Sequence, residues 1–147
     1  MKFKPSWTIA SVSLTTGLAA IVLFNRFIDQ SAGVCQNQLH AERLSRTELL
    51  FGLSKSNGAL ITEPEFQRFV DREITPLFPD GLTVLSATGQ FKNADAKVVK
   101  EGTKLLLVVY PFDRETDRKI ERIRQAYKST FQQESVLRID QRSCVSF

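Results

Sequence analysis

The chain has 147 residues, with 42% hydrophobic and 24% charged side chains and a formal net charge of +4. This composition excludes disordered, collagen-like and low-complexity classes and fits a single domain. One histidine and two cysteines are too few for a cysteine–histidine zinc site, and a serine–histidine–aspartate triad would depend on His40 alone.

Residues 1–35 have the pattern of a targeting segment. Lys2 and Lys4 precede residues 7–24, a run without any charged side chain. A membrane-spanning helix needs roughly 17–25 apolar residues, whereas the apolar stretch of a cleaved signal usually has about 7–15. The run is just long enough to span a bilayer, so the sequence predicts contact with a membrane through an N-terminal hydrophobic helix.

Three fates of this segment stay open. It is an uncleaved anchor, a signal peptide cleaved after residues 31–33, or a lipid-attached terminus at Cys35. All three place the body of the protein outside the cytoplasm. The predicted location is the cell envelope: anchored in the inner membrane and facing the periplasm, or secreted if the segment is cleaved.

The two cysteines fit such a compartment. Cys35 lies just before the predicted domain and Cys144 lies close to the C-terminus. In an oxidising compartment two cysteines tend to pair, although two unrelated thiols are the alternative. The sequence predicts a Cys35–Cys144 disulfide, and it has no C-x-x-C redox motif.

The first half of the body reads as linker, strand and helix. Residues 36–46 are polar and read as a linker, and residues 47–54 alternate as a strand with Leu49, Phe51 and Leu53 on one face. Thr62 followed by Glu65 is typical of a capping box. The helix that it opens has one apolar face, made of Phe66, Phe69, Val70 and Ile74, and ends at Thr75 and Pro76.

The second half reads as two strands, a helix and a last strand. Residues 82–91 and 104–110 are the two strands, and Asp113 is placed to cap a helix that continues to Gln132. The last strand, residues 134–140, is expected to place Leu137 and Ile139 on one face and Val136 and Arg138 on the other.

The order β-α-β-β-α-β over residues 47–147 predicts an α+β, ferredoxin-like domain with a four-stranded antiparallel sheet in the order 4-1-3-2 and two helices on one face. The other face would be too apolar to remain in contact with water. We therefore expect a homodimer through this face, or another partner that covers it. The residues expected there are Leu50, Leu85, Ala87, Val136 and part of 105–109.

Four stretches resemble a known family: residues 47–53, 69–76, 133–138 and above all Phe78-Pro79-Asp80-Gly81-Leu82-Thr83-Val84. They are similar to the uncharacterised bacterial family called domain of unknown function 3574. Where many members have Gly-Gln-Trp, this chain has Gly89-Gln90-Phe91. The resemblance implies an export signal and supports the fold, and it implies no activity.

Candidate site residues are few. Glu48 and Arg138 are predicted to lie on neighbouring strands and on the same face, as a polar ligand site or as a structural cross-strand pair. Gln90, Glu101 and Lys104 would add polar groups at one end of the sheet. Tyr127 and Phe131 are expected in the core. No phosphate-binding glycine loop and no D-x-D-x-D-G spacing occurs, so no metal or cofactor is predicted.

The sequence favours a ligand-binding or protein-interaction module of the envelope that performs no catalysis, because no nucleophile–base pair is evident. The alternative is a small enzyme of the dimeric α+β barrel type, with a polar site around Glu48 and Arg138. Residues 113–132 carry six basic and four acidic side chains, a net charge of +2 that fits a solvated surface, so no nucleic-acid partner is expected.

Overall fold

The computed structural model describes residues 34–55, 57–92 and 96–147. The predicted anchor or signal segment lies outside the described residues except for its last two positions. The chain divides into two units, and the second of them, Arg43–Val145, contains the candidate sites described below. Within the described ranges, no helix combines the length and the hydropathy needed to cross a membrane.

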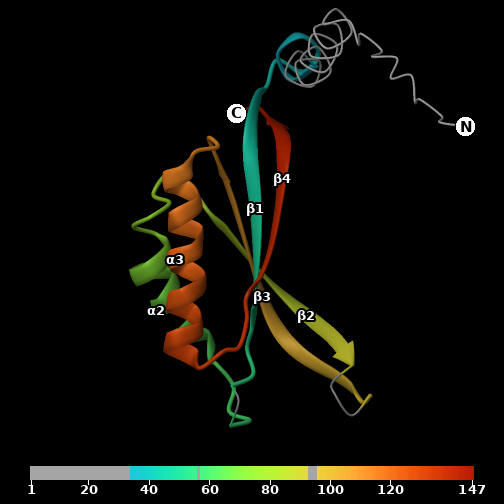
Figure 1. Ribbon diagram of the computed structural model, residues 1–147, viewed down its shortest axis with the longest axis vertical. Helices are drawn as coiled ribbons and strands as arrows, with labels where there is room; N and C mark the ends of the chain where they lie inside the picture. Colours follow the sequence, from blue (N-terminus) through green and yellow to red (C-terminus); the bar gives the residue numbers. More distant parts are fainter. Residues whose placement is uncertain (1–33, 56, 93–95) are drawn as a thin grey trace, which may run out of the picture. The chain divides into compact units, whose positions relative to one another are not determined.

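Four strands form one antiparallel sheet in the order β2-β3-β1-β4 (Figure 1). The strands are β1 (Glu42–Gly52), β2 (Thr83–Lys92), β3 (Val98–Tyr110) and β4 (Leu137–Val145). Strand β3 pairs with β1 on one side and with β2 on the other, both antiparallel. This arrangement confirms the predicted α+β class and the predicted strand order.

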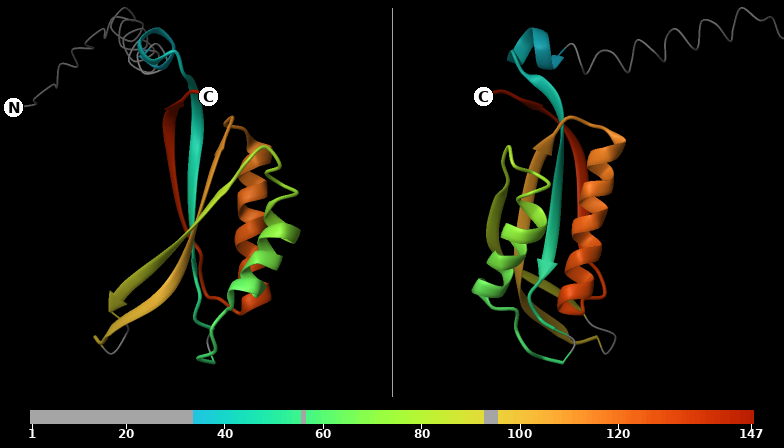
Figure 2. Two further views of the ribbon diagram at one scale, coloured as in Figure 1. Left: turned by 180° about the vertical axis from the view of Figure 1, so that it is seen from behind. Right: turned by 90° about the vertical axis from the view of Figure 1, so that its left-hand side faces the viewer.

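Two helices cover one face of the sheet (Figure 2). Helix α2 (Glu63–Phe69) continues into a π-helical turn, η1 (Val70–Ile74), and α3 (Arg114–Phe131) connects β3 to β4. The predicted capping box is present: the Thr62 side chain accepts from the backbone N–H of Glu65, and the Glu65 carboxylate accepts from the backbone N–H of Thr62. Asp113 caps α3, as expected, by accepting from the Thr116 amide at 2.6 Å.

The core lies between the sheet and the helices. Leu49 and Phe51 of β1 are fully buried, and so are residues from α2, α3 and β3. Tyr127 is the centre of an aromatic cluster, with its ring centroid 4.5 Å from that of Phe51 and 4.8 Å from that of Phe131. Edge-to-face and tilted ring pairs of this kind add stabilisation beyond their buried area. The buried set that joins these layers includes Phe66, Phe69, Ile74, Leu106, Val108, Ile120, Ile123 and Val136.

Strands β1 and β3 begin earlier than the sequence suggested, and β4 lies later. The expected linker 36–46 includes the first five residues of β1, and β3 begins at Val98 instead of residue 104. Pairing explains the difference. Polar positions such as Ser45 are held in the sheet by their partner Tyr110, although their side chains carry little strand signal.

The prediction for the two faces of the last strand is wrong. Val136 is 1% exposed and belongs to the core, whereas Leu137 and Ile139 are exposed. Side chains alternate along a strand. Because Val136 faces the core, Arg138, two positions later, also lies on the side of the helices. The sheet face turned away from α2 and α3, here called the open face, therefore carries Leu137 and Ile139 in place of Val136.

Candidate functional site

A groove of about 650 Å³ lies on the open face at the end of the sheet where β1 stops. The pairing between β1 and β3 ends at Gly52 opposite Thr103, while β3 and β2 continue as a hairpin. One wall of the groove is this hairpin, and the other is the connection 132–135 between α3 and β4. Gln90 and Glu101, two of the predicted site residues, both line it.

Two glycines shape the floor of the groove, Gly52 by making room for the Glu101 side chain and Gly89 by making room for Thr103. Gly89 is the partner of Glu101 on β2, and Gly52 lies at the end of β1. A Cβ atom at Gly52 would be 3.1 Å from the Glu101 Oε1, and a Cβ atom at Gly89 would be 3.0 Å from the Thr103 Oγ1. Both distances are shorter than ordinary van der Waals contacts, so the shape of the groove floor depends on these two positions.

The wall formed by residues 132–135 is held to the rest of the domain. Gln132 ends α3 in the left-handed conformation, at φ 55°. The Gln133 side-chain amide donates to the carbonyl oxygen of Ser54 at 2.9 Å, and its backbone N–H donates to the carbonyl oxygen of Lys128 at 3.0 Å. These bonds fix the wall next to the end of β1 before any ligand binds.

The charges in the groove are all negative. Among the described residues that line it, Glu101 and Glu134 are the charged ones, on a chain with a net charge of +4. Phe91 adds an aromatic ring that is 49% exposed. The remaining lining consists of amide and hydroxyl groups and of aliphatic side chains, among them Leu50, Val99 and Leu137. The groove thus suits a ligand with a positive centre and a flat or apolar part.

Tyr127 supports the groove from the core side. Its hydroxyl donates to the carbonyl oxygen of Gly52 at 2.8 Å. Burial, together with the negative charge of Glu101, raises the pKa of the Tyr127 hydroxyl above its usual range. The hydroxyl therefore stays protonated and keeps donating to Gly52.

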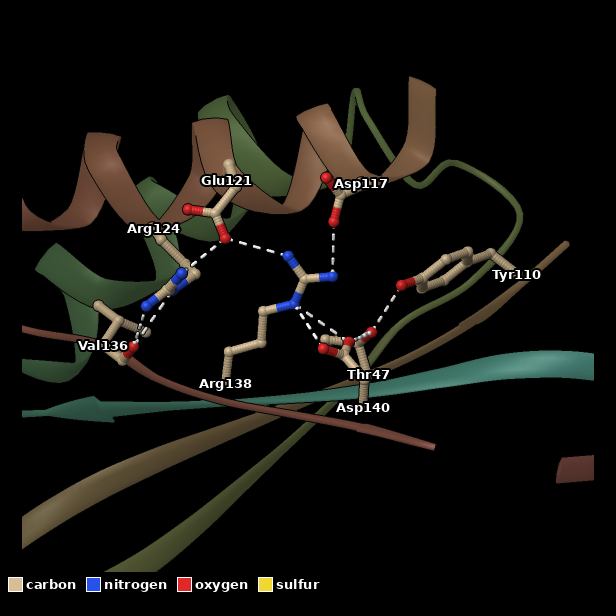
Figure 3. A network of polar contacts seen from close by, with 8 residues as sticks. All are labelled: Thr47, Tyr110, Asp117, Glu121, Arg124, Val136, Arg138 and Asp140. Atoms are coloured by element: carbon tan, nitrogen blue, oxygen red, sulfur yellow. Dashed lines mark hydrogen bonds and ion pairs between the residues drawn. The ribbon is translucent and has the colours of Figure 1, made fainter. Parts of the chain in front are cut away.

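A separate polar network surrounds Arg138 between β4 and α3 (Figure 3). Its guanidinium contacts Asp117 at 2.8 Å, Glu121 at 3.0 Å and Asp140 at 2.8 Å. Burial acts to lower the pKa of Arg138, but the hydrogen bonds to these three carboxylates outweigh it and raise the pKa above its usual value. All of the donor nitrogens of Arg138 are thereby used within the domain.

The same network reaches the core through Thr47. The Tyr110 hydroxyl donates to the Thr47 Oγ1 at 2.6 Å, and the Thr47 hydroxyl in turn donates to the Asp140 Oδ1 at 2.6 Å (Figure 3). Thr47 is fully buried. These two hydrogen bonds join three neighbouring strands, β3, β1 and β4, so their role is to stabilise the sheet.

Glu48 and Arg138 do not form one site. Glu48 lies beside Arg46, at 2.6 Å between Oε1 and Nη2, and alternates with the buried residues Thr47 and Leu49. It therefore lies on the open face, whereas Arg138 contacts α3 on the opposite face. The expectation of a shared face is wrong because of the reversed assignment of β4.

Lys104 lies apart from the groove. It is buried beneath α2, where its Nζ donates to the Ser86 Oγ at 2.8 Å and forms an ion pair with Glu63 at 2.5 Å. Hence the structure brings together only Gln90 and Glu101 of the five predicted site residues.

Sequence reasoning missed Glu134, Phe91 and the two glycines of the groove. The signal for Gly52 and Gly89 was their position inside strands, where a glycine often marks close approach of another group. Within the described ranges, no group of three or more histidine, cysteine, aspartate or glutamate side chains is arranged to hold a metal ion. Both cysteines are disulfide-bonded, which confirms that the protein carries a disulfide.

Two solved structures resemble this chain. One is a phage SAM lyase in complex with S-methyl-5'-thioadenosine, at a TM-score of 0.55 and 12% identity over 71% of this chain and 90% of that one. The other is a phage SAM lyase in the apo state, at a TM-score of 0.54 and 15% identity over 68% of this chain and 81% of that one. At this level of identity the likeness shows the fold alone.

No curated protein matches the chain in sequence. A family model, "Protein of unknown function (DUF3574)", matches residues 46–147. This range covers the whole sheet except the first four residues of β1, together with both helices. The chain therefore belongs to the DUF3574 family of proteins of unknown function.

Proposed function

We propose that the domain binds a small organic cation of the S-adenosylmethionine type in the groove on the open face. The observation that carries the proposal is the position of Glu101, a carboxylate laid over Gly52 in a groove whose charged lining residues are all acidic. A sulfonium or ammonium centre is the natural counterpart of such a carboxylate in a partly enclosed site.

Two further observations support an adenosyl compound over a simple amine. Gln90 and the exposed ring of Phe91 line the same groove, and an aromatic ring is a group that stacks on a purine. The related fold of the phage SAM lyase, which was solved with S-methyl-5'-thioadenosine, supports the same class of ligand.

The test is a calorimetric titration of the full chain with S-adenosylmethionine and, separately, with the uncharged S-methyl-5'-thioadenosine. The proposal predicts saturable binding of both, with the charged compound bound more tightly. The substitution Glu101→Gln should weaken binding of the charged compound about tenfold, the effect of one lost charge-assisted contact. It should change the affinity for the uncharged compound much less.

Glu48→Gln is the matched control, because Glu48 is also a carboxylate of the open face but is paired with Arg46 outside the groove. It should leave both affinities unchanged. Failure of both compounds to bind, or an equal loss in the Glu48 and Glu101 variants, would contradict the proposal.

A second candidate is an enzyme that cleaves such a sulfonium compound. The observation that favours it is the shared fold with a protein named a lyase, together with Glu101 in the groove. Incubation of the full chain with S-adenosylmethionine, followed by chromatography, separates the two functions. Product formation that is lost in Glu101→Gln supports the enzyme, and binding without turnover supports a ligand-binding module.

Delivery to the cell envelope remains part of the proposal. It is supported by the apolar run behind Lys2 and Lys4 in the sequence and by the disulfide-bonded state of both cysteines, which is typical of oxidising compartments. Fractionation of cells that express the full chain tests it. Recovery in the envelope or secreted fraction is expected, and recovery in the cytosol would contradict it.

A homodimer through the open face is also proposed. Leu85 on one outer strand and Leu137 and Ile139 on the other are 53%, 55% and 44% exposed there, and exposed apolar surface favours association. Light scattering of the full chain should give twice the mass of one chain, and Leu85→Glu should shift the protein to the monomer. A monomeric parent chain would contradict this part of the proposal.

A further inference from the structure

A second hollow, of about 370 Å³, lies between α2 with its π-helical turn and the C-terminal end of α3. None of its lining residues lines the groove described above. Here it is called the basic hollow, because Lys55, Arg68 and Arg72 line it together with Glu65 and Glu73.

The carboxylate of Glu65 is fully engaged within the domain. It accepts from the backbone N–H of Thr62 at 2.8 Å, from the Thr62 hydroxyl at 2.7 Å and from the Lys55 Nζ at 3.1 Å. These bonds neutralise Lys55 and complete the cap of α2. The charges that remain to be balanced in the basic hollow are those of Arg68, Arg72 and Glu73.

Neither arginine forms an ion pair within the described ranges, although Glu73 lines the same hollow. None of the ion pairs found in the described ranges includes Arg68, Arg72 or Glu73. Arg68 and Arg72 are four residues apart on one helical segment, and like charges at this spacing repel each other. An anion bound between them would remove the repulsion.

The local backbone is also unusual. The N–H of Thr75 donates to the carbonyl oxygen of Val70 at 2.9 Å, which is the five-residue spacing of a π-helical turn. Such turns are rare and occur frequently at functional sites. Arg72 and Glu73 belong to this turn, so the irregular segment supplies two of the charged residues that line the basic hollow.

The floor of the basic hollow is aromatic. Phe69 and Phe131 line it, with their ring centroids 5.7 Å apart in an edge arrangement. The Lys55 Nζ lies over the ring of Phe131, 6.0 Å from its centroid. A guanidinium matches the planar, two-point geometry of a phosphate or carboxylate oxygen pair. The rings are largely buried, at 4% and 6% exposed, and the part of each that lines the hollow offers contact to an apolar body.

We propose that the basic hollow binds a phosphate monoester with an aromatic or apolar body, its phosphate held by Arg68 and Arg72. The Thr130 hydroxyl, which also lines the hollow, is placed to add a hydrogen bond. This site is independent of the proposed groove function, because it uses different residues and an opposite charge.

Phenyl phosphate and inorganic phosphate are the probes, each titrated into the full chain. Phenyl phosphate should bind saturably and more tightly than inorganic phosphate, since only the former contacts the rings. Arg68→Gln and Arg72→Gln should each weaken phenyl phosphate about tenfold, and Glu73→Gln should tighten it, because the variant removes a repelling carboxylate.

The control is Arg122→Gln, which removes the same charge from an exposed position on α3 outside the hollow. This variant should leave the affinity within twofold of the parent. A loss equal to that of Arg68→Gln, or no saturable binding of phenyl phosphate below about 10 mM, would overturn the site. Unchanged melting temperatures of the ligand-free variants would show that each has folded.

Vesicles distinguish the source of the phosphate group. Sedimentation with phosphatidic acid vesicles, compared with phosphatidylcholine vesicles, reports a lipid phosphate. Sedimentation of the protein with phosphatidic acid vesicles that is lost in Arg68→Gln but kept in Arg122→Gln assigns the site to a lipid headgroup. Phenyl phosphate binding without such sedimentation assigns it to a soluble phosphate monoester.

Discussion

The carboxylate of Glu101 lies so close to Gly52 that a Cβ atom at Gly52 would be 3.1 Å from its Oε1. The two residues come from neighbouring strands, and Tyr127 donates to the carbonyl oxygen of the same glycine. The position of the groove carboxylate is therefore linked to the aromatic core through a single backbone position.

A methyl group at Gly52 should affect ligand binding more than folding. In Gly52→Ala only the flexible end of Glu101 has to move, so the free energy of unfolding should change by less than about 1 kcal/mol. The displaced carboxylate should weaken binding of S-adenosylmethionine about fivefold, which is less than the effect of losing the charge completely. Urea denaturation and calorimetry measure the two effects.

Gly89→Ala is the matched comparison. The new Cβ would be 3.0 Å from the Oγ1 of Thr103, which is buried and has a stiff, branched side chain. This variant should lose roughly 1–3 kcal/mol in the free energy of unfolding. Equal stabilities of the two variants would show that the floor of the groove is not built as described.

Removal of the buried hydroxyl of Thr47 should destabilise the domain. Thr47→Val keeps the shape of the side chain but leaves the buried Tyr110 hydroxyl without its partner. The expected loss is roughly 1–3 kcal/mol in urea denaturation. Thr88→Val, at an exposed position of β2, should change stability by less than about 0.5 kcal/mol.

A second variant tests the assignment to this hydrogen bond. In the Thr47→Val background, Tyr110→Phe should lower the free energy of unfolding by less than it does in the parent chain, because both hydroxyls of the pair are then absent. Strictly additive losses would mean that the Thr47–Tyr110 bond contributes nothing to stability.

Acid stability should depend on Glu65. The backbone hydrogen bond from Thr62 is the main cause that lowers the pKa of Glu65 from 4.5 to about 2. A carboxylate with a lowered pKa in the folded state contributes stability above its unfolded pKa and loses it as the pH falls. The parent chain should therefore lose stability between pH 4.5 and about 2 more steeply than Glu65→Gln.

Denaturation curves at a series of acid pH values measure this effect. Glu42→Gln, which changes an exposed carboxylate, is the control and should keep the slope of the parent chain. A Glu65→Gln variant with the same pH dependence as the parent would contradict the assignment.

The sequence predicted the fold well because local signals agreed with one another. Thr62 and Glu65 marked the start of α2, Asp113 marked the start of α3, and alternation marked the buried face of β1. The candidate site was predicted less well. The one-position error in β4 placed Arg138 on the wrong face, and no local signal shows which of two apolar neighbours, Val136 or Leu137, enters the core.

The groove depends on relations between distant positions. Glu101, Gly52 and Gly89 become neighbours only through the register of three strands, and strand register is set by the whole sheet. The sequence drew attention to Gln90 and Glu101 but offered no reason to join them to residues 132–135.

The disulfide-bonded state of Cys35 and Cys144 should contribute to stability. If the two residues pair with each other within one chain, the closed loop contributes at most about 4.7 kcal/mol. The unreduced full chain should run as a single chain on a denaturing gel, and reduction should lower its melting temperature. A band of twice the mass that disappears on reduction would instead show pairing between chains.

The most direct test of the proposed groove is an amide chemical-shift map of the full chain with S-methyl-5'-thioadenosine added. The account predicts that the largest shifts fall on the groove residues, with Gly89, Glu101 and Thr103 moving together as the ligand saturates. Shifts confined to α2 and α3, or no shift at a saturating concentration of the ligand, would contradict it.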